Sequence, residues 1–151
     1  KDIEAREHIA YGSTVAGITM QLTSTIAQHS MEHSMSVYHH NLPHGAGLIM
    51  ISKAFAEFFI ERHACDGQFI KMAKAMGIAN ADKPEDFITA LVKLQEDCGV
   101  ADLKMSDFGF TPDEAMTLAK GARSMQGGLF EANPCEMTYE DCAGVFEKSY
   151  R

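Results

Sequence analysis

Apolar residues recur every three or four positions along most of this chain, the spacing that places side chains on one face of an α-helix. The first such segment runs from Asp2 to about Gln28 without a proline, and its second half is apolar on every side. That pattern predicts a helix buried by its neighbours. Gly12 and Gly17 interrupt the segment. Because glycine costs about 1 kcal/mol relative to alanine inside a helix, we expect them to mark a break or to permit close packing.

Five further helices are predicted by the same spacing and by local start and stop signals. Thr111 and Thr138 each stand three residues before an acidic residue, the pattern of an N-terminal capping box. Gly77 and Gly99 are each expected to end a helix at its C-terminus. No alternating strand pattern of useful length occurs, so the fold class is all-α, a bundle of about six to eight helices. The predicted helices cover about residues 46–63, 69–77, 84–98, 111–124 and 138–150.

Length and charge limit the possible functions. With 151 residues the chain suits one domain, residues 1–151, that buries roughly 70% of its unfolded surface. A net charge of -8 without a cluster of Lys and Arg argues against a nucleic-acid surface. The four cysteines form no C-x-x-C pair and are expected to be free thiols in a reducing cytoplasm.

No apolar run is long enough to predict a membrane span, and the N-terminus lacks the pattern of a signal peptide. A cytoplasmic location is therefore expected. The chain begins at Lys1, directly in a helical pattern. We expect it to be a piece of a longer protein.

Histidines supply the strongest chemical signal, because five of the seven lie between His29 and His44. Neutral imidazole is the commonest protein ligand for transition metals. His29 and His33 are four residues apart, on one face of a helix, and His44 is held after a proline at a loop-to-helix junction. A metal site is the sharper interpretation. The alternative is that these histidines are buried and bonded to carbonyl groups, or face solvent.

The remaining candidates near this cluster carry weaker signals. His39 and His40 are adjacent and are expected on the surface or in a loop, while His8 and His63 are expected on helix surfaces. Glu32 lies one residue before His33, so it points about 100° away on a helix. We expect it to be solvated or to cap a helix, although beside a metal it could be a ligand or a base. Metal sites usually have three or more protein ligands, and no third ligand is obvious.

Four stretches resemble a known family. They are AREHIAYGSTVAGI at residues 5–18, QHSMEH at 28–33, LPHG at 42–45 and LFEANP at 129–134. Together they closely resemble the C-terminal half of the iron-containing (group III) alcohol dehydrogenases. The resemblance covers essentially the whole chain, and its two histidine motifs occur in the family's order.

The resemblance implies a two-domain parent protein. The family has an N-terminal α/β dinucleotide-binding domain, which is absent here, and an all-helical C-terminal domain that this chain is similar to. The family's metal is held by a D-x-x-x-H motif, by the first histidine of H-x-x-x-H and by the histidine of P-H-G. The last two match His29 and His44, whereas the D-x-x-x-H motif is expected upstream of Lys1.

Further roles follow from the same resemblance. His33 matches a histidine close to the nicotinamide that is assigned to proton transfer, and Met20 matches an apolar residue near the nicotinamide, although it is equally plausible as core filling. Phe130 is a weaker candidate for the pocket wall. Glu32 stands where the family commonly has a small residue.

The expected function is that of a metal-dependent NAD(P)-linked alcohol dehydrogenase or aldehyde reductase acting on a small alcohol or aldehyde. The metal is expected to be Fe²⁺, with Zn²⁺ as the alternative, and the nucleotide NAD or NADP. The full-length protein is expected to be a homo-oligomer, and this chain alone is expected to be inactive. The alternative is a stand-alone, histidine-rich helical module that binds a metal or a partner protein without catalysis.

Overall fold

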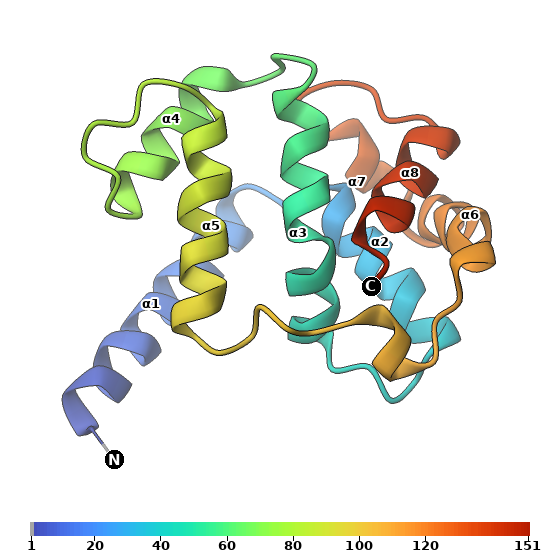
Figure 1. The fold of residues 1–151 in the computed structure, drawn as a ribbon, viewed down its shortest axis with the longest axis horizontal. Coiled ribbons are helices and arrows are strands. Elements are labelled where there is room, and N and C mark those ends of the chain that lie inside the picture. The colour runs from blue at the N-terminus through green and yellow to red at the C-terminus, as the bar shows by residue number, and fades with distance from the viewer. Residues whose placement is uncertain (1) are drawn as a thin grey trace.

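Helices alone build the part of the chain that the structure describes, residues 2–151 of a computed structural model (Figure 1). Eight α-helices and two 3₁₀ helices occur in this range, and no strand does, which confirms the all-α prediction. The α-helices are α1 (Ile3–Leu22), α2 (Ala27–Tyr38), α3 (His44–Ile60), α4 (Asp66–Ala75), α5 (Glu85–Asp97), α6 (Ala115–Gln126), α7 (Gly128–Glu131) and α8 (Tyr139–Ser149); the 3₁₀ helices are η1 (Met105–Phe108) and η2 (Pro112–Glu114). No helix within residues 2–151 is long and apolar enough to cross a membrane.

The core lies among α2, α3, α6 and α8. Helix α2 packs against α3 and α6, and α8 packs against the same two helices. Phe59 of α3 and Phe146 of α8 are the largest side chains that are almost completely buried there. Helices α4 and α5 pack on each other, and α5 also contacts α3 on the opposite side from α2 (Figure 1). Helix α2 therefore packs between α3 and α6.

Small residues bring α2 and α6 together. The Ser30 and Ser34 hydroxyls donate to backbone carbonyls of α6, at 2.6 Å to Ala122 and 2.8 Å to Leu118. A Cβ added to Gly121 would lie only 2.4 Å from the Ser34 hydroxyl oxygen. Glycine at this position leaves room for the Ser34 hydroxyl, and the two hydroxyl bonds fix the rotation of α2 about its axis.

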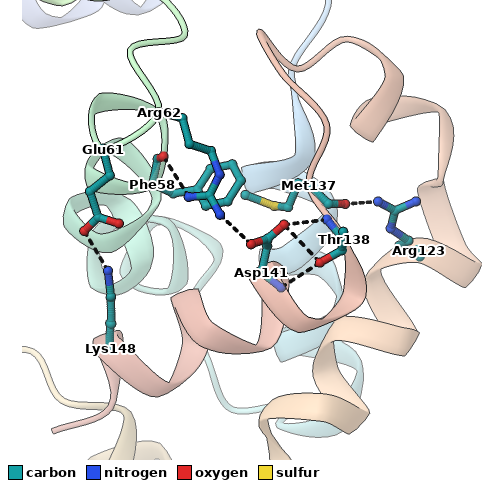
Figure 2. Close-up of polar contacts among 8 residues, drawn as sticks. All are labelled: Phe58, Glu61, Arg62, Arg123, Met137, Thr138, Asp141 and Lys148. Atoms are coloured by element: carbon teal, nitrogen blue, oxygen red, sulfur yellow. Dashed lines mark hydrogen bonds and ion pairs between the residues drawn. The ribbon is translucent and has the colours of Figure 1, made fainter.

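A group of ion pairs joins the end of α3 to α8 (Figure 2). Arg62 donates to Asp141 at 2.6 Å, and Lys148 donates to Glu61 at 2.8 Å. Asp141 also completes the capping box with Thr138 that begins α8. Ion pairs at such exposed positions contribute at most about 1 kcal/mol each, so they align the two helices more than they stabilise them.

The local boundary signals are confirmed. Thr111 and Thr138 both form capping boxes, with Glu114 and Asp141 respectively. Gly77 follows α4 with φ of 104°, in the left-handed region that glycine adopts most easily.

The prediction that the first helical segment is buried is wrong. None of the residues of α1 is buried, and Leu22 is 80% exposed. The helix extends away from the other helices (Figure 1). Gly12 and Gly17 do not break it, and a Cβ on either would meet nothing within 4 Å. The apolar pattern is that of a buried helix, but among residues 2–151 no element covers it.

Candidate metal centre

Three of the five clustered histidines converge at the junction of α2 and α3. His29 and His33 lie one turn apart on α2, and His44 is the first residue of α3, after the extended Pro43. The ring centroid of His44 lies 5.5 Å from that of His29 and 5.4 Å from that of His33. The fold therefore brings together the three histidines selected from the sequence.

Glu32 is completely buried, so the prediction that it is solvated or caps a helix is wrong. Its Oε2 is hydrogen-bonded to Nδ1 of His44, and its Oε1 accepts from the Ser36 hydroxyl at 2.6 Å. The offset of about 100° from His33 turns Glu32 toward α3, and α3 supplies the imidazole partner. Its carboxylate nevertheless lies near His33 as well, because ligand atoms of Glu32, His33 and His44 fall within 4.8 Å of one another; the sequence alone gave no sign of this contact with α3.

His33 is oriented by a residue far away in the sequence. Its Nδ1 is 2.8 Å from Oε1 of Gln126, at the end of α6. Because the amide oxygen only accepts, this contact requires the proton on Nδ1 and leaves the Nε2 lone pair available. Among residues 2–151, Nε2 of His33 has no hydrogen-bond partner.

The electrostatic environment of His29 favours the neutral ring. Burial lowers the pKa of its imidazole, and the neighbouring His44 and His33 lower it further, while Glu32 opposes them. A metal binds the neutral ring, because only that form has a free lone pair.

The donor set at this site fits a divalent transition metal. Glu32, His33 and His44 each offer a ligand atom, and these atoms lie within 4.8 Å of one another. Imidazole nitrogen and carboxylate oxygen are donors that Fe²⁺ and Zn²⁺ accept. The His44 side chain is 51% exposed, so the site is open on one side. Ligands from another part of a protein could complete it from there.

The other histidines lie outside this cluster. His39 was expected at the surface or in a loop, and it follows α2 but is half-buried. Its ring packs against Phe110 with centroids 3.8 Å apart, and its Nε2 is 3.0 Å from Glu114. His40 is exposed, as expected, and so are the helix-surface candidates, His8 on α1 and His63 just after α3.

The two apolar candidates have different surroundings. Met20 lies on α1 and is 54% exposed. Phe130 of α7 is buried in the core, with the Arg123 guanidinium 4.6 Å from its ring centre.

Sequence reasoning missed Gln126 and Ser36 altogether. No local pattern marks Gln126, because it meets His33 across 93 positions of sequence.

Comparison with known proteins decides the family. Residues 1–150 match the Fe-containing alcohol dehydrogenase family, C-terminal part. The chain belongs to this family. The resemblance seen in the histidine motifs is therefore confirmed.

Curated relatives agree with this assignment. The chain is 28% identical to the long-chain primary alcohol dehydrogenase AdhA of Thermoanaerobacter ethanolicus and 23% identical to the 1,3-propanediol dehydrogenase of Klebsiella pneumoniae, covering 99% of this chain and 38% of each relative. It is also 28% identical to the human mitochondrial hydroxyacid-oxoacid transhydrogenase. The chain thus spans less than two fifths of the length of these proteins.

Solved structures share the helical fold. A halo-thermophilic archaeal alcohol dehydrogenase from a Red Sea brine pool superposes with a TM-score of 0.90 at 28% identity, over 99% of this chain and 38% of that one. A 1,3-propanediol oxidoreductase superposes with a TM-score of 0.88 at 23% identity, over 99% of this chain and 39% of that one. The arrangement of the helices is that of the C-terminal part of iron-type alcohol dehydrogenases.

Proposed function

We propose that this chain is the metal- and substrate-binding helical part of an NAD(P)-linked alcohol dehydrogenase or aldehyde reductase that acts on a small alcohol or aldehyde. The observation that carries the proposal is the convergence of His29, His33 and His44, with ring centroids 5.4 to 6.4 Å apart, in a chain of this family.

In this proposal His29 and His44 hold a divalent metal, Fe²⁺ or Zn²⁺. When bound, the metal supplies Lewis acidity toward the alcohol or aldehyde oxygen. Two histidines are fewer ligands than such sites usually have. The remaining ligands would come from a D-x-x-x-H motif in the rest of the protein, which would approach the open side of His44.

His33 would move the hydroxyl proton. Gln126 holds the proton on Nδ1, so the Nε2 lone pair can accept the proton of an alcohol during oxidation and return it during reduction. The nicotinamide, of NAD or NADP, would be bound mainly by the rest of the protein, with Met20 as the candidate contact from this chain. Homo-oligomerisation and the cytoplasmic location stay predictions.

The exposed helix α1 supports the proposal that another part of a longer protein packs against this domain. Large apolar side chains such as Ile3, Tyr11 and Leu22 are more than two thirds exposed along it. A helix that is apolar on all sides is typical of the interior of a larger protein. Because this chain covers 38% of the length of its relatives, we expect the rest of the protein to pack against α1.

The proposal is tested in the full-length protein with two substitutions. His44→Ala is expected to abolish metal retention, measured by elemental analysis, because it removes one ligand. His33→Ala is expected to keep the metal but to lower turnover by about 10²- to 10⁴-fold, the usual contribution of a general acid or base.

His63→Ala is the matched control, because His63 is exposed and pairs with Asp66 at the start of α4, outside the histidine cluster. It is expected to change neither property. Unchanged metal content in His44→Ala would refute the ligand assignment. An unaltered rate across the pH range in His33→Ala would refute the proton-transfer role.

A second candidate function is a metal-binding module without catalysis. It is favoured by the three ligand atoms of Glu32, His33 and His44 within 4.8 Å of one another on this chain alone. The upstream coding sequence discriminates between the two. An upstream dinucleotide-binding region with a D-x-x-x-H motif supports the dehydrogenase, whereas a reading frame that begins close to Lys1 supports the module.

A further inference from the structure

The buried carboxyl group of Glu32 is the least expected feature of the site. Its residue is 0% exposed, and burying a carboxylate is costly unless hydrogen bonds compensate. Here both oxygens have partners, Ser36 on the same helix and His44 on the next one. A group retained at such a cost invites a functional explanation.

We propose that Glu32 is a positioning residue that fixes the tautomer and orientation of His44. An ionised carboxylate only accepts hydrogen bonds, so its bond to His44 requires the imidazole proton on Nδ1. The Nε2 lone pair is then directed away from Glu32. Since Glu32 is fully buried and His44 is 51% exposed, the His44 ring spans from the core to the open side of the site.

The packing around Glu32 holds its carboxylate in place. A Cβ added to Gly47 of α3 would lie 2.7 Å from Cγ of Glu32 and 3.0 Å from its Oε1. The Leu42 side chain borders the same space, and the Ser36 hydroxyl donates from the other direction at 2.6 Å. Confined in this way, the Glu32 carboxylate holds the His44 ring through Nδ1 and leaves Nε2 as the ligand atom.

The part of this inference that concerns metal affinity rests on the proposed function. Carboxylates that accept from the second nitrogen of a ligating histidine fix its orientation and raise its basicity, and losing one costs typically 10- to 100-fold in metal affinity. Glu32 would therefore raise the affinity of a site whose other ligands come from elsewhere in the protein.

The first test measures the histidine tautomers of the metal-free 151-residue chain. Long-range ¹H–¹⁵N correlation spectra at about pH 9, where imidazoles are neutral, are expected to show His44 protonated on Nδ1. In Glu32→Gln, where an amide can donate as well as accept, the Nε2-protonated form of His44 is expected to gain population. Glu114→Gln removes the matched carboxylate beside His39 and is expected to leave His44 unchanged.

The second test measures Zn²⁺ affinity in the full-length protein by competition with a chelator. Glu32→Gln is expected to weaken Zn²⁺ binding 10- to 100-fold, while Glu114→Gln binds as the unmodified protein does. Circular dichroism verifies that each variant is folded. If Glu32→Gln does not fold, the spectrum of the unmodified chain still decides the tautomer.

The outcomes separate this inference from the proposed function. An Nε2-protonated His44 in the unmodified chain, or a tautomer that Glu32→Gln leaves unaltered, would overturn the inference alone. Full Zn²⁺ affinity in Glu32→Gln, with affinity lost in His44→Ala, would also overturn the inference and keep the proposed function. Full affinity in both variants would overturn the proposed function as well.

Discussion

At the scale of single residues, the candidate site depends on side chains whose partners are distant in sequence. His33 is held by Gln126 across 93 positions, and His44 by Glu32 across 12. In each case an accepting oxygen, on the exposed Gln126 or on the buried Glu32, selects which ring nitrogen carries the proton. The histidines supply the reactive ring nitrogens, and these oxygens determine which nitrogen keeps a free lone pair.

Gln126 provides a residue-scale prediction in the full-length protein. Gln126→Leu keeps the approximate shape of the side chain but removes the oxygen that accepts from His33. Because His33 then loses its fixed tautomer, turnover is expected to fall about 10-fold or more, with metal content unchanged. Steady-state kinetics and elemental analysis measure the two quantities.

The control is Gln68→Leu, a substitution on α4, which packs against α5 and not against α2, the helix that carries His33. It is expected to leave turnover unchanged. If Gln126→Leu turned over as fast as the unmodified protein, the orientation of His33 by Gln126 would not matter for proton transfer.

At the scale of elements, α2 is the critical helix, because it carries His29, Glu32 and His33 and packs between α3 and α6. Its rotation is set by the hydroxyl bonds of Ser30 and Ser34 to α6. A change at the contact of α2 with α6 is therefore expected to alter both the free energy of unfolding and the geometry of the histidine site.

Gly121→Ala tests this contact. The added methyl group would lie 2.4 Å from the Ser34 hydroxyl oxygen, so either this hydroxyl must turn away and lose its bond to Leu118 or α2 and α6 must move apart. The expected cost is about 1–3 kcal/mol in the free energy of unfolding. The control Gly144→Ala in α8 meets nothing within 4 Å and should stabilise the chain by about 0.5–1 kcal/mol. Urea unfolding compares the two, and equal stability would show that α2 and α6 do not constrain each other here.

Helix α1 gives the opposite prediction. Since none of its residues is buried, deleting residues 1–22 is expected to change the free energy of unfolding of the remaining chain by less than about 1 kcal/mol. Self-association should decrease, because the deletion removes an exposed apolar helix. Urea unfolding and analytical ultracentrifugation measure these effects.

Deletion of residues 139–151 is the comparison, because α8 buries Val145 and Phe146 in the core. It is expected to abolish cooperative unfolding. Loss of the cooperative transition on deleting residues 1–22 would instead show that α1 supports the fold.

At the scale of the whole molecule, the chain presents an open site and an uncovered helix. Both features agree with its span of 38% of the length of its relatives. A dehydrogenase needs a bound nicotinamide held against the substrate carbon, and the proposed function assigns most of that binding to the rest of the protein.

The isolated 151-residue chain is therefore expected to fold into a helical domain without dehydrogenase activity. Circular dichroism should show a helical spectrum, and oxidation of NADH in the presence of an aldehyde and Fe²⁺ or Zn²⁺ should stay at the background rate. The full-length protein serves as the positive control. Turnover by the isolated chain would contradict this assignment.

Much of the fold follows from the sequence because the signals are local. The capping boxes at Thr111 and Thr138, and the glycine stop at Gly77, depend only on residues within one helical turn. The motifs around His29, His33 and His44 indicated the family for a similar reason, because residue type and spacing can be read directly.

Tertiary structure alone decided what each of these elements faces. It buried Glu32 against His44, brought Gln126 to His33 and placed His39 against Phe110. It also left α1 uncovered, although its composition is that of a buried helix. The physical reason is the same throughout: spacing along a helix gives the direction of a side chain, but its burial and partners depend on which other element packs there.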